Sequence, residues 1–275
     1  MIKIMMTVRN RLAITKKTIE ALKRHTETPW QLYVYDNLTN YKIQEHVDFL
    51  GKAFINGDIA QLTFNSATST FDAFSKAVAS NQFGYSHLND PNRKNYDFLM
   101  LLDNDMIVMP GWDKVFLEAW RIVRKKGWDH IKYITQFTGG LSPKNSIPLK
   151  IQNYDCYTGK HGGSGFWTVR TNFFEDVGFL NIKETIGLNK QHDQKYWGKL
   201  ETASKGKNYG LGIRCEKVYH TGGLAGSICN ILTREKESND KLNKIKFEEK
   251  EDTINRMSFD TFIKHVESTK KWTRW

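Results

Sequence analysis

The sequence predicts an α/β fold in which a mainly parallel central sheet is flanked by helices. Three observations indicate this fold. Strand-like apolar runs alternate with helix-like segments through residues 1–110, these runs end in polar residues, and 275 residues are enough to bury a substantial core. Such alternation is typical of parallel sheets whose crossover helices cover both faces.

The predicted strands of this part are short runs of apolar and β-branched residues. They are IKIMMTV at 2–8, WQLYVYDN at 30–37, IAQLTFN at 59–65 and YDFLMLLDND at 96–105. Between them, apolar residues at helical spacing predict helices over 13–26, 43–54 and 69–80. Ligands of open α/β sheets bind beyond the carboxyl ends of the strands, so we expect the polar strand ends to form a binding edge.

The character of the sequence changes after Pro110. An amphipathic helix is predicted over 111–128, and a stretch rich in Gly, Ser, Asn and Pro at 133–165 is predicted to be a long surface loop. A strand and a helix are expected within 166–180, a helix over 191–206, and then a strand that ends at His220. These shifts divide the chain into two halves of one domain, 1–110 and 111–232, and a charged helical C-terminal extension at 233–275.

The formal net charge of +11 is unevenly distributed. Residues 111–232 carry 18 basic and 10 acidic side chains, a net charge of +8, whereas 1–110 carry +1 and 233–275 carry +2. A basic middle third favours a polyanionic partner, such as nucleic acid, an acidic glycan or a membrane surface. A generally solvated basic surface explains the charge equally well.

Cysteine usage and hydropathy indicate the compartment. Cys156, Cys215 and Cys229 show no CxxC spacing, so we expect free thiols in a reducing environment rather than disulfides or a zinc site. The N-terminal apolar run precedes basic residues, the reverse of a signal peptide, and no run approaches the ~18 apolar residues of a membrane span. These features predict a soluble, cytoplasmic protein.

The stretch DFLMLLDNDMIVMP at 97–110 places Asp103 and Asp105 at the end of the most apolar predicted strand. Burial opposes ionisation of a carboxylate, so two of them need a partner there. Mn²⁺ or Mg²⁺ suits such oxygen ligands and leaves part of its shell for substrate phosphates. Asp-Asn-Asp is also a common turn sequence, and this alternative stays open.

Further candidates are scattered along the chain. Asp36 ends the second predicted strand and Asn65 the third, Asp193 opens a helix, and His220 ends a late strand. A carboxylate at a strand end can accept hydrogen bonds from a nucleobase or ribose. The simpler alternatives are a first-turn charge for Asp193 and a buried core histidine for His220.

Taken in order, several segments resemble the A-type (GT-A) glycosyltransferases, especially the family-2-like nucleotide-sugar transferases. The resemblance spans residues 2–225 and rests on TVRNR, YVYDN, TFNSATSTFDAFSKA, FLMLLDNDMIVMPGW, GGSGFWTVRTNFFEDVGFLN, HDQKYWGKL and VYHTGG. It implies a Rossmann-like sheet, a donor-binding half at 1–110 and an acceptor-side, catalytic half at 111–232. His192 stands where that family usually has an acidic residue.

The resemblance also implies a role for each matching position. For the nucleotide-diphosphate sugar, expected to be a UDP-sugar, it implies Thr7, Arg9, Asp36, Asn65, Asp103 and Asn104; for Mn²⁺ or Mg²⁺, Asp103, Asp105 and His220; and for the acceptor side, Gly163, Ser164, Trp167 and His192. Asp193 would be the general base of an inverting transfer to an acceptor hydroxyl, although retaining relatives also have a late histidine.

The acceptor is the least determined part of the prediction. The charge of 111–232 favours a polyanion, with hydroxymethylated DNA of a virus as one example, whereas a bacterial-envelope polysaccharide or lipid-linked glycan is the alternative. The terminal KKWTRW at 270–275 could contact a membrane surface or cover an apolar groove. A non-catalytic nucleotide-sugar-binding module and a phosphatase of the haloacid dehalogenase type are rivals from other classes; no GxGxxG follows the first strand, which disfavours a dehydrogenase.

Overall fold

A computed structural model of the protein describes residues 1–37, 42–65, 72–136, 146–160, 165–181, 192–221 and 240–268. Its centre is a nine-stranded sheet with the order β3-β2-β1-β4-β9-β6-β10-β8-β7. The strands are β1 (Ile2–Val8), β2 (Trp30–Asn37), β3 (Gln61–Asn65), β4 (Phe98–Asp103), β6 (Tyr133–Thr135), β7 (Ser146–Ile151), β8 (Tyr154–Gly159), β9 (Phe166–Val169) and β10 (Gly210–Ile213). A two-stranded sheet pairs β5 (Met106–Val108) with β11 (Val218–His220).

The sheet has a parallel half and a mixed half. The strands β3, β2, β1 and β4 are mutually parallel, as the alternation of strands and helices predicts. Beyond β4, the strand β9 runs antiparallel to both β4 and β6, and β10 is again parallel to β6. The predicted α/β fold is confirmed, and the strands β3, β2, β1 and β4 form its parallel half.

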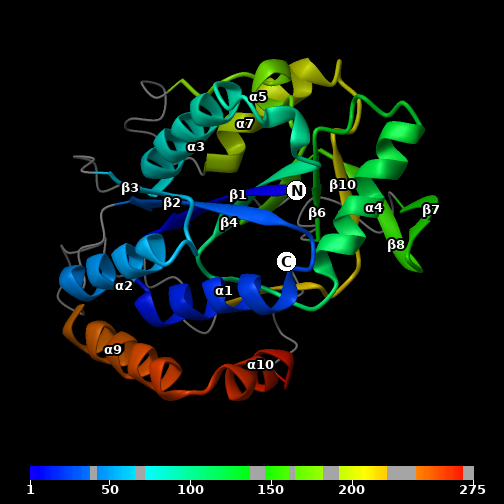
Figure 1. Ribbon diagram of the computed structural model, residues 1–275. Helices are drawn as coiled ribbons and strands as arrows, with labels where there is room; N and C mark the ends of the chain where they lie inside the picture. The colour runs from blue at the N-terminus through cyan, green and yellow to red at the C-terminus, as the bar shows by residue number, and fades with distance from the viewer. Residues whose placement is uncertain are drawn as a thin grey trace.

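Helices cover both faces of the sheet (Figure 1). They are α1 (Leu12–His25), α2 (Ile43–Ile55), α3 (Asp72–Leu88), α4 (Trp112–Lys125), α5 (Phe173–Asp176), α7 (His192–Ala203), α9 (Asp240–Arg256) and α10 (Phe259–Ser268), with a short 3₁₀ turn at Arg93–Asn95. One face packs against α1, α2 and α4, and the other against α3, α5 and α7. None of the described helices is long and apolar enough to span a membrane.

The side chains of β1 alternate between two core clusters. Ile4 and Met6 belong to the cluster beneath α1, whereas Met5 belongs to the cluster beneath α3 and α7. This alternation follows from the two-residue repeat of a strand, and each face of β1 is buried because helices cover both. The central strand is therefore anchored on both sides, and its carboxyl end is held in a fixed place.

The predicted long loop at 133–165 is wrong for the part of it that the structure describes. The strands β7 and β8 form a hairpin whose tip is Gln152 and Asn153, both with positive φ (48° and 72°). Two consecutive left-handed residues are typical of a tight hairpin turn, and asparagine tolerates that conformation. Exposed positions of the hairpin carry polar side chains, so the composition of this stretch resembles that of a loop although it forms strands.

Within the predicted C-terminal extension, the helices α9 and α10 pack against α1 (Figure 1). Phe262 and Val266 of α10 are fully buried in the core cluster beneath α1. Polar contacts fix the same interface: Lys17 Nζ donates to the Met257 carbonyl at 2.7 Å, and the Arg24 guanidinium lies 4.6 Å from the Phe259 ring centroid. The segment KKWTRW lies outside the described residues.

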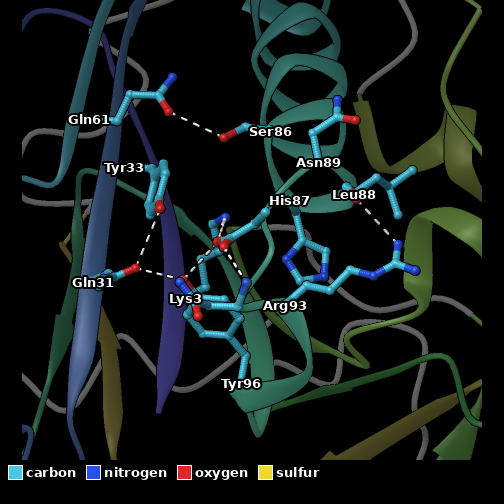
Figure 2. Close-up of polar contacts among 12 residues, drawn as sticks. Lys3, Gln31, Tyr33, Gln61, Ser86, His87, Leu88, Asn89, Arg93 and Tyr96 are labelled. Carbon is cyan, nitrogen blue, oxygen red and sulfur yellow. Dashed lines mark hydrogen bonds and ion pairs between the residues drawn. The ribbon is translucent and has the colours of Figure 1, made fainter.

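At its amino end β1 carries a buried lysine (Figure 2). Lys3 is fully buried, and its Nζ donates to Asp90 Oδ2 at 2.8 Å. The same ammonium lies 4.4 Å from the ring centroid of Tyr33 and 5.2 Å from that of Tyr96. Tyr96 Oη donates at 2.9 Å to the Asp90 oxygen that Lys3 also contacts, and it lies 2.7 Å from Gln31 Oε1. The buried Lys3 ammonium therefore finds its partners within the protein itself.

Candidate active site at the carboxyl edge of the sheet

Predicted donor-side residues meet at the carboxyl edge of the parallel strands. The register pairs from β3 to β4 are Asn65 with Asn37, Asp36 with Val8, and Thr7 with Asp103. Thr7 Oγ1 donates to Asp103 Oδ1 at 3.1 Å, and Asn65 Nδ2 donates to Asn37 Oδ1 at 2.9 Å. The sheet thus gathers side chains from four strands into one row, as expected for a ligand-binding edge.

Asn104 forms the turn between the two carboxylates and is held from below. Its Nδ2 donates to Thr15 Oγ1 at 2.8 Å and to the Asn10 carbonyl at 3.3 Å, while its own carbonyl accepts from Thr18 Oγ1 at 2.7 Å. These contacts fix the turn to α1, so Asn104 stabilises the site; its predicted contact with the donor remains a prediction. The turn interpretation and the binding interpretation of Asp-Asn-Asp are therefore compatible.

Asp105 is nearly fully buried, with a side chain that is 4% exposed. Its Oδ2 forms an ion pair with Arg11 and lies 3.2 Å from His220 Nε2. Burial by itself lowers the pKa of His220, but the Asp105 carboxylate and its hydrogen bond raise it above the ordinary value. Positive charge from Arg11 and His220 therefore balances a carboxylate that burial alone would disfavour.

The pairing of β11 with β5 explains how His220 reaches Asp105. His220 lies opposite Met106 in this pair, and Thr221 donates both its N–H and its Oγ1–H to the Asp105 carbonyl at 2.8 Å. More than a hundred residues of sequence separate these partners, yet the small sheet clamps them together. The prediction that a late strand delivers His220 to the site is supported by this geometry.

Arg11 was missed among the predicted site residues, although it belongs to TVRNR. It follows Asn10, and both residues have positive φ (57° for Arg11 and 52° for Asn10). Non-glycine residues in this region are uncommon, and two in succession mark a strained loop that the surrounding contacts must hold. The Arg11 carbonyl accepts from Thr15 Oγ1 and from the Thr15 N–H, both at 2.9 Å. This loop aims the guanidinium at Asp105.

Gly165 is a second residue that the predictions missed. Its carbonyl accepts the Asp103 N–H at 2.8 Å, and a Cβ added to it would lie 2.0 Å from Met106 Cε and 3.4 Å from Asp103 Oδ2. Any larger residue at this position would require the flexible end of the Met106 side chain to move, whereas glycine fits this close approach to Asp103 without rearrangement. The glycine-rich segment GGSG before the strand indicated this site in the sequence, but the prediction named Gly163 and Ser164 and not Gly165.

Glu251 connects the C-terminal extension to this edge. Its Oε2 accepts the Ala13 N–H at 2.9 Å, at the first turn of α1, where Arg11 as N-cap residue offers no side-chain acceptor. A carboxylate near a helix N-terminus satisfies one free N–H and opposes the helix dipole. Burial nevertheless raises the pKa of Glu251. The extension therefore braces the helix that begins directly behind the Arg11 loop.

Solved structures with a similar arrangement of strands and helices are glycosyltransferases. "GalNAc-T7 with UDP, GalNAc and Mn2+" matches with a TM-score of 0.57 at 11% identity, covering 98% of this chain and 57% of that one. S. aureus TarS 1–349 matches with a TM-score of 0.51 at 12% identity, covering 93% and 72%. Its complex with UDP-GlcNAc matches with a TM-score of 0.51 at 11% identity, covering 90% and 70%.

The chain has the GT-A fold. At these identities the likeness shows the fold and not the substrates. No family model matches the sequence, and no curated protein is similar enough in sequence to count as a relative. The roles of individual residues in this GT-A fold thus depend on the geometry of the chain itself.

The metal ligands predicted for this GT-A fold are only partly assembled. Carboxylate oxygens from Asp103 and Asp105 and the imidazole of His220 form a donor set that suits Mn²⁺ or Mg²⁺. Within the described part of the chain, however, no group of three His, Cys, Asp or Glu side chains has the spacing of a metal site. Arg11 already pairs with Asp105. An ion that uses Asp105 would have to displace that guanidinium or share the carboxylate with it.

The predicted acceptor-side residues are placed less completely. Trp167 on β9 is fully buried and stacks on Tyr133, with ring centroids 4.5 Å apart. It therefore packs the core behind the acceptor side, and a direct acceptor contact remains a prediction. The helix α7 begins at His192, as expected for the helix that Asp193 opens, but the two side chains lie outside the described part. Gly163 and Ser164 also lie outside it.

Proposed function

We propose that the protein is a glycosyltransferase that moves a sugar from a nucleotide-diphosphate sugar, most simply a UDP-sugar, to an acceptor hydroxyl. One observation supports this most directly: a GT-A fold whose carboxyl edge pairs Thr7 with Asp103 and Val8 with Asp36, and in which His220 lies beside Asp105. That edge is where open α/β sheets bind nucleotides. The UDP complexes among the similar structures support a uridine donor.

The residues of the edge would divide the donor between them. Asp36, nearly buried at the end of β2, would accept hydrogen bonds from the nucleoside, and Asn65 and Arg9 would lie beside it. Mn²⁺ or Mg²⁺ held by Asp103, Asp105 and His220 would neutralise the charge that develops on the departing diphosphate. Arg11 supplies positive charge at the same place and would orient the phosphates by bidentate hydrogen bonds.

Asp193 is proposed as the general base. It would take the proton from the acceptor hydroxyl while that oxygen attacks the anomeric carbon and the diphosphate leaves, which inverts the configuration. Support comes from the position of Asp193 in the first turn of α7, which packs against the same core cluster as α3 and β9. The acceptor would enter from the half that includes residues 111–232. Because that half carries the charge of +8, a polyanion such as hydroxymethylated DNA is the acceptor we propose.

Release of sugar from a panel of UDP-sugars, measured with Mn²⁺, with Mg²⁺ and with a chelator, tests the proposal. We expect one donor to be hydrolysed slowly in the absence of acceptor and transferred when hydroxymethylated DNA is added. Transfer only to envelope oligosaccharides would replace the proposed acceptor. Nucleotide binding without turnover on any donor would instead indicate a non-catalytic binding module.

Variants distinguish the proposed roles. Asp193→Asn is expected to reduce transfer by about 10²-fold or more, within the range of general-base catalysis, and to leave the Kd for UDP unchanged. Asp105→Asn is expected to weaken UDP binding in the presence of the metal. Asp48→Asn is the matched control, because Asp48 is exposed on α2 and accepts a hydrogen bond from the neutral side chain of Gln44. An Asp193→Asn protein that keeps most of its transfer activity would refute Asp193 as the base.

A further inference from the structure

A surface pocket of about 510 Å³ lies at the opposite edge of the sheet from Asp103 and Asp105. It is lined by Trp128, His130, Ile147, Thr158, Gly206, Lys207 and Asn208. Residues 128–130 precede β6 and residues 206–208 precede β10, and these strands run parallel to each other and, through β9, to β4. The pocket is therefore at the amino edge, outside the site described above.

This pocket joins two basic segments that are far apart in the sequence, one of which ends in a tryptophan. RKKGW at 124–128 spans the end of α4, and KGKN at 205–208 follows α7. Both belong to the part of the chain with a net charge of +8. The fold therefore concentrates at one place charges that the sequence spreads over about eighty positions, and it does so away from the carboxyl edge.

The backbone of Trp128 is fixed by hydrogen bonds at this pocket. Its N–H donates to the Val123 carbonyl at 3.1 Å, and its carbonyl accepts from Arg170 Nη2 and from the Ile131 N–H, both at 3.0 Å. The indole is only half-buried, so part of it lines the pocket. A partly exposed indole offers a flat apolar surface on which a planar ring can stack.

Positive charge at the pocket is only partly neutralised. Lys132 pairs with Asp176, Arg170 pairs with Asp129, and Lys150 pairs with Asp155, but neither Lys126 nor Lys207 forms an ion pair with a described residue. Lys126 Nζ lies 5.3 Å from the Trp128 ring centroid. Burial and the charge of Lys207 lower the pKa of His130, as expected in a field of positive sign.

The rim adds hydrogen-bonding groups. Asn208 Nδ2 donates to Thr158 Oγ1 at 3.3 Å, which ties the 205–208 turn to β8 and leaves the Asn208 oxygen and a second amide hydrogen at the pocket. A flat apolar surface, two cations and a carboxamide together match a nucleotide unit, with its base on the indole and its phosphate on the lysines. The volume is within the range of pockets that hold a ligand of that size.

We propose that this pocket binds single-stranded nucleic acid, one nucleotide of which stacks on Trp128 while Lys126 and Lys207 contact its phosphates. A duplex would hide its base faces from the indole, so an unpaired strand is the ligand that the pocket favours. The inference does not rest on the proposed glycosyl transfer. A strand bound here and an acceptor at the carboxyl edge could belong to the same polymer, which would make the pocket an anchoring subsite.

Fluorescence anisotropy of a labelled oligothymidylate tests the proposal. The double variant Lys126→Glu, Lys207→Glu is expected to weaken binding at least tenfold and to reduce the slope of log affinity against log salt by about 1.4, or ~0.7 for each lost phosphate contact. The matched control is Lys52→Glu, Lys94→Glu, which makes the same charge change at exposed sites that do not line the pocket and should alter affinity less than about threefold. Equal losses in the two variants would overturn the proposal.

Trp128 variants test the stacking contact. Trp128→Ala is expected to weaken binding about tenfold, within the range for a stacked base, and Trp128→Phe should retain most of the affinity and the folded state. The proposal would be overturned if a duplex or polygalacturonate bound more tightly than the oligomer. It would also be overturned if thymidine monophosphate displaced the labelled oligomer as effectively as the unlabelled oligomer does. Donor hydrolysis should be the same in all these variants as in wild type, so failure here is distinct from failure of the proposed function.

Discussion

The two ends of β1 each have a buried ion pair, but the pairs are built differently. At the amino end, Lys3 reaches Asp90 from a regular strand, and aromatic rings surround the ammonium. At the carboxyl end, Arg11 reaches Asp105 from a loop with two consecutive left-handed residues, and His220 contacts the same carboxylate oxygen. The first pair is enclosed by relaxed structure, and the second depends on strained structure held by several partners.

This difference is the one expected between an ion pair that only stabilises the fold and one that lies at a binding site. Strained backbone persists only where neighbouring contacts over-determine it, and such places cluster at binding and catalytic sites. Here Asn104, Thr15 and Glu251 hold the Arg11 loop from below and behind. The amino end has no such unusual backbone conformation, since Lys3 lies in regular parallel strand pairing. We therefore expect variants at the amino end to lower stability more than ligand binding. Variants at the carboxyl end should change ligand binding more than stability.

The largest expected effect is on stability, at the amino end. Lys3→Met leaves the Asp90 carboxylate with its hydrogen bonds but without its cation, and we expect the free energy of unfolding to fall by about 3 kcal/mol. Urea denaturation measures this, and UDP binding by the folded protein should be unchanged. The matched control is Lys23→Met, which breaks a pair that is 49% exposed on the lysine side and should change stability by less than about 1 kcal/mol.

A double variant completes this test. Replacing both partners, Lys3→Met with Asp90→Leu, should recover much of the lost stability, because no uncompensated charge then remains buried. If Lys3→Met weakens UDP binding more than it weakens the fold, the two ends are energetically coupled and the comparison between them fails.

At the carboxyl end the expected effect is on metal binding. Arg11 and a divalent ion compete for the Asp105 carboxylate, so Arg11→Ala should increase the affinity for Mn²⁺ in the absence of donor about tenfold, or ~1.4 kcal/mol. Titration of Mn²⁺ followed by electron paramagnetic resonance measures it. Arg11→Lys keeps the charge and serves as the control, with a smaller change expected. A lower Mn²⁺ affinity in Arg11→Ala would show that Arg11 supports the metal site instead of competing with it.

The sequence predicted one end of this comparison better than the other. The strand-to-helix alternation placed β1, β2, β3 and β4, and the polar strand ends then located Asp36, Asn65, Thr7 and Asp103, because strand direction alone brings these ends together. Arg11 was missed because its position depends on a loop with two left-handed residues, a conformation that the residue types of TVRNR do not predict. Glu251 was missed because its contact with Ala13 joins positions 238 residues apart.

The hairpin at β7 and β8 shows a different limit of prediction. Its strand β7 is at the edge of the sheet and β8 lies next to it, and both carry exposed polar side chains, so their composition resembled that of a loop. The Gln-Asn turn was the signal, but it is weaker than an Asn-Gly turn. Core-facing and site-facing residues could thus be predicted from pattern, whereas contacts that depend on loop conformation or on distant helices could not.

A smaller effect, on both stability and UDP binding, is expected at Glu251, which contacts the first turn of α1. Glu251→Ala removes the acceptor at the Ala13 N–H and should lower stability by about 1 kcal/mol, as for a lost helix cap, and should also raise the Kd for UDP because the Arg11 loop loosens. Glu251→Gln keeps an oxygen at this place without a buried charge and should restore both quantities. Asp252→Asn is the control, since Asp252 is exposed and pairs loosely with Lys42. A stability loss without any change in UDP binding would make the brace purely structural.

The smallest expected effect is a difference in acid stability. Burial by itself raises the pKa of Asp90, but hydrogen bonds from Lys3, Asn92 and Tyr96 bring it below the ordinary value of 3.8. Because the native carboxyl binds its proton less readily than the unfolded one, this contribution is present above about pH 4 and is lost as the pH falls through the lower native value. We expect it to be less than about 1 kcal/mol, since Asp90 is partly exposed.

His46 acts in a higher pH range, which allows the two contributions to be separated. Burial, with Lys16 nearby, lowers the pKa of His46 to about 4 from 6.5, so stability falls between pH 6.5 and 4 as the unfolded chain takes up this proton. The His46 contribution is the same in Lys3→Met, so the stability curve of this variant should lie below the wild-type curve and run parallel to it down to about pH 4. Below that pH the wild-type curve should fall more steeply. Urea midpoints measured from pH 7 to pH 3 test this, and parallel curves throughout would mean that Lys3 does not hold Asp90 ionised.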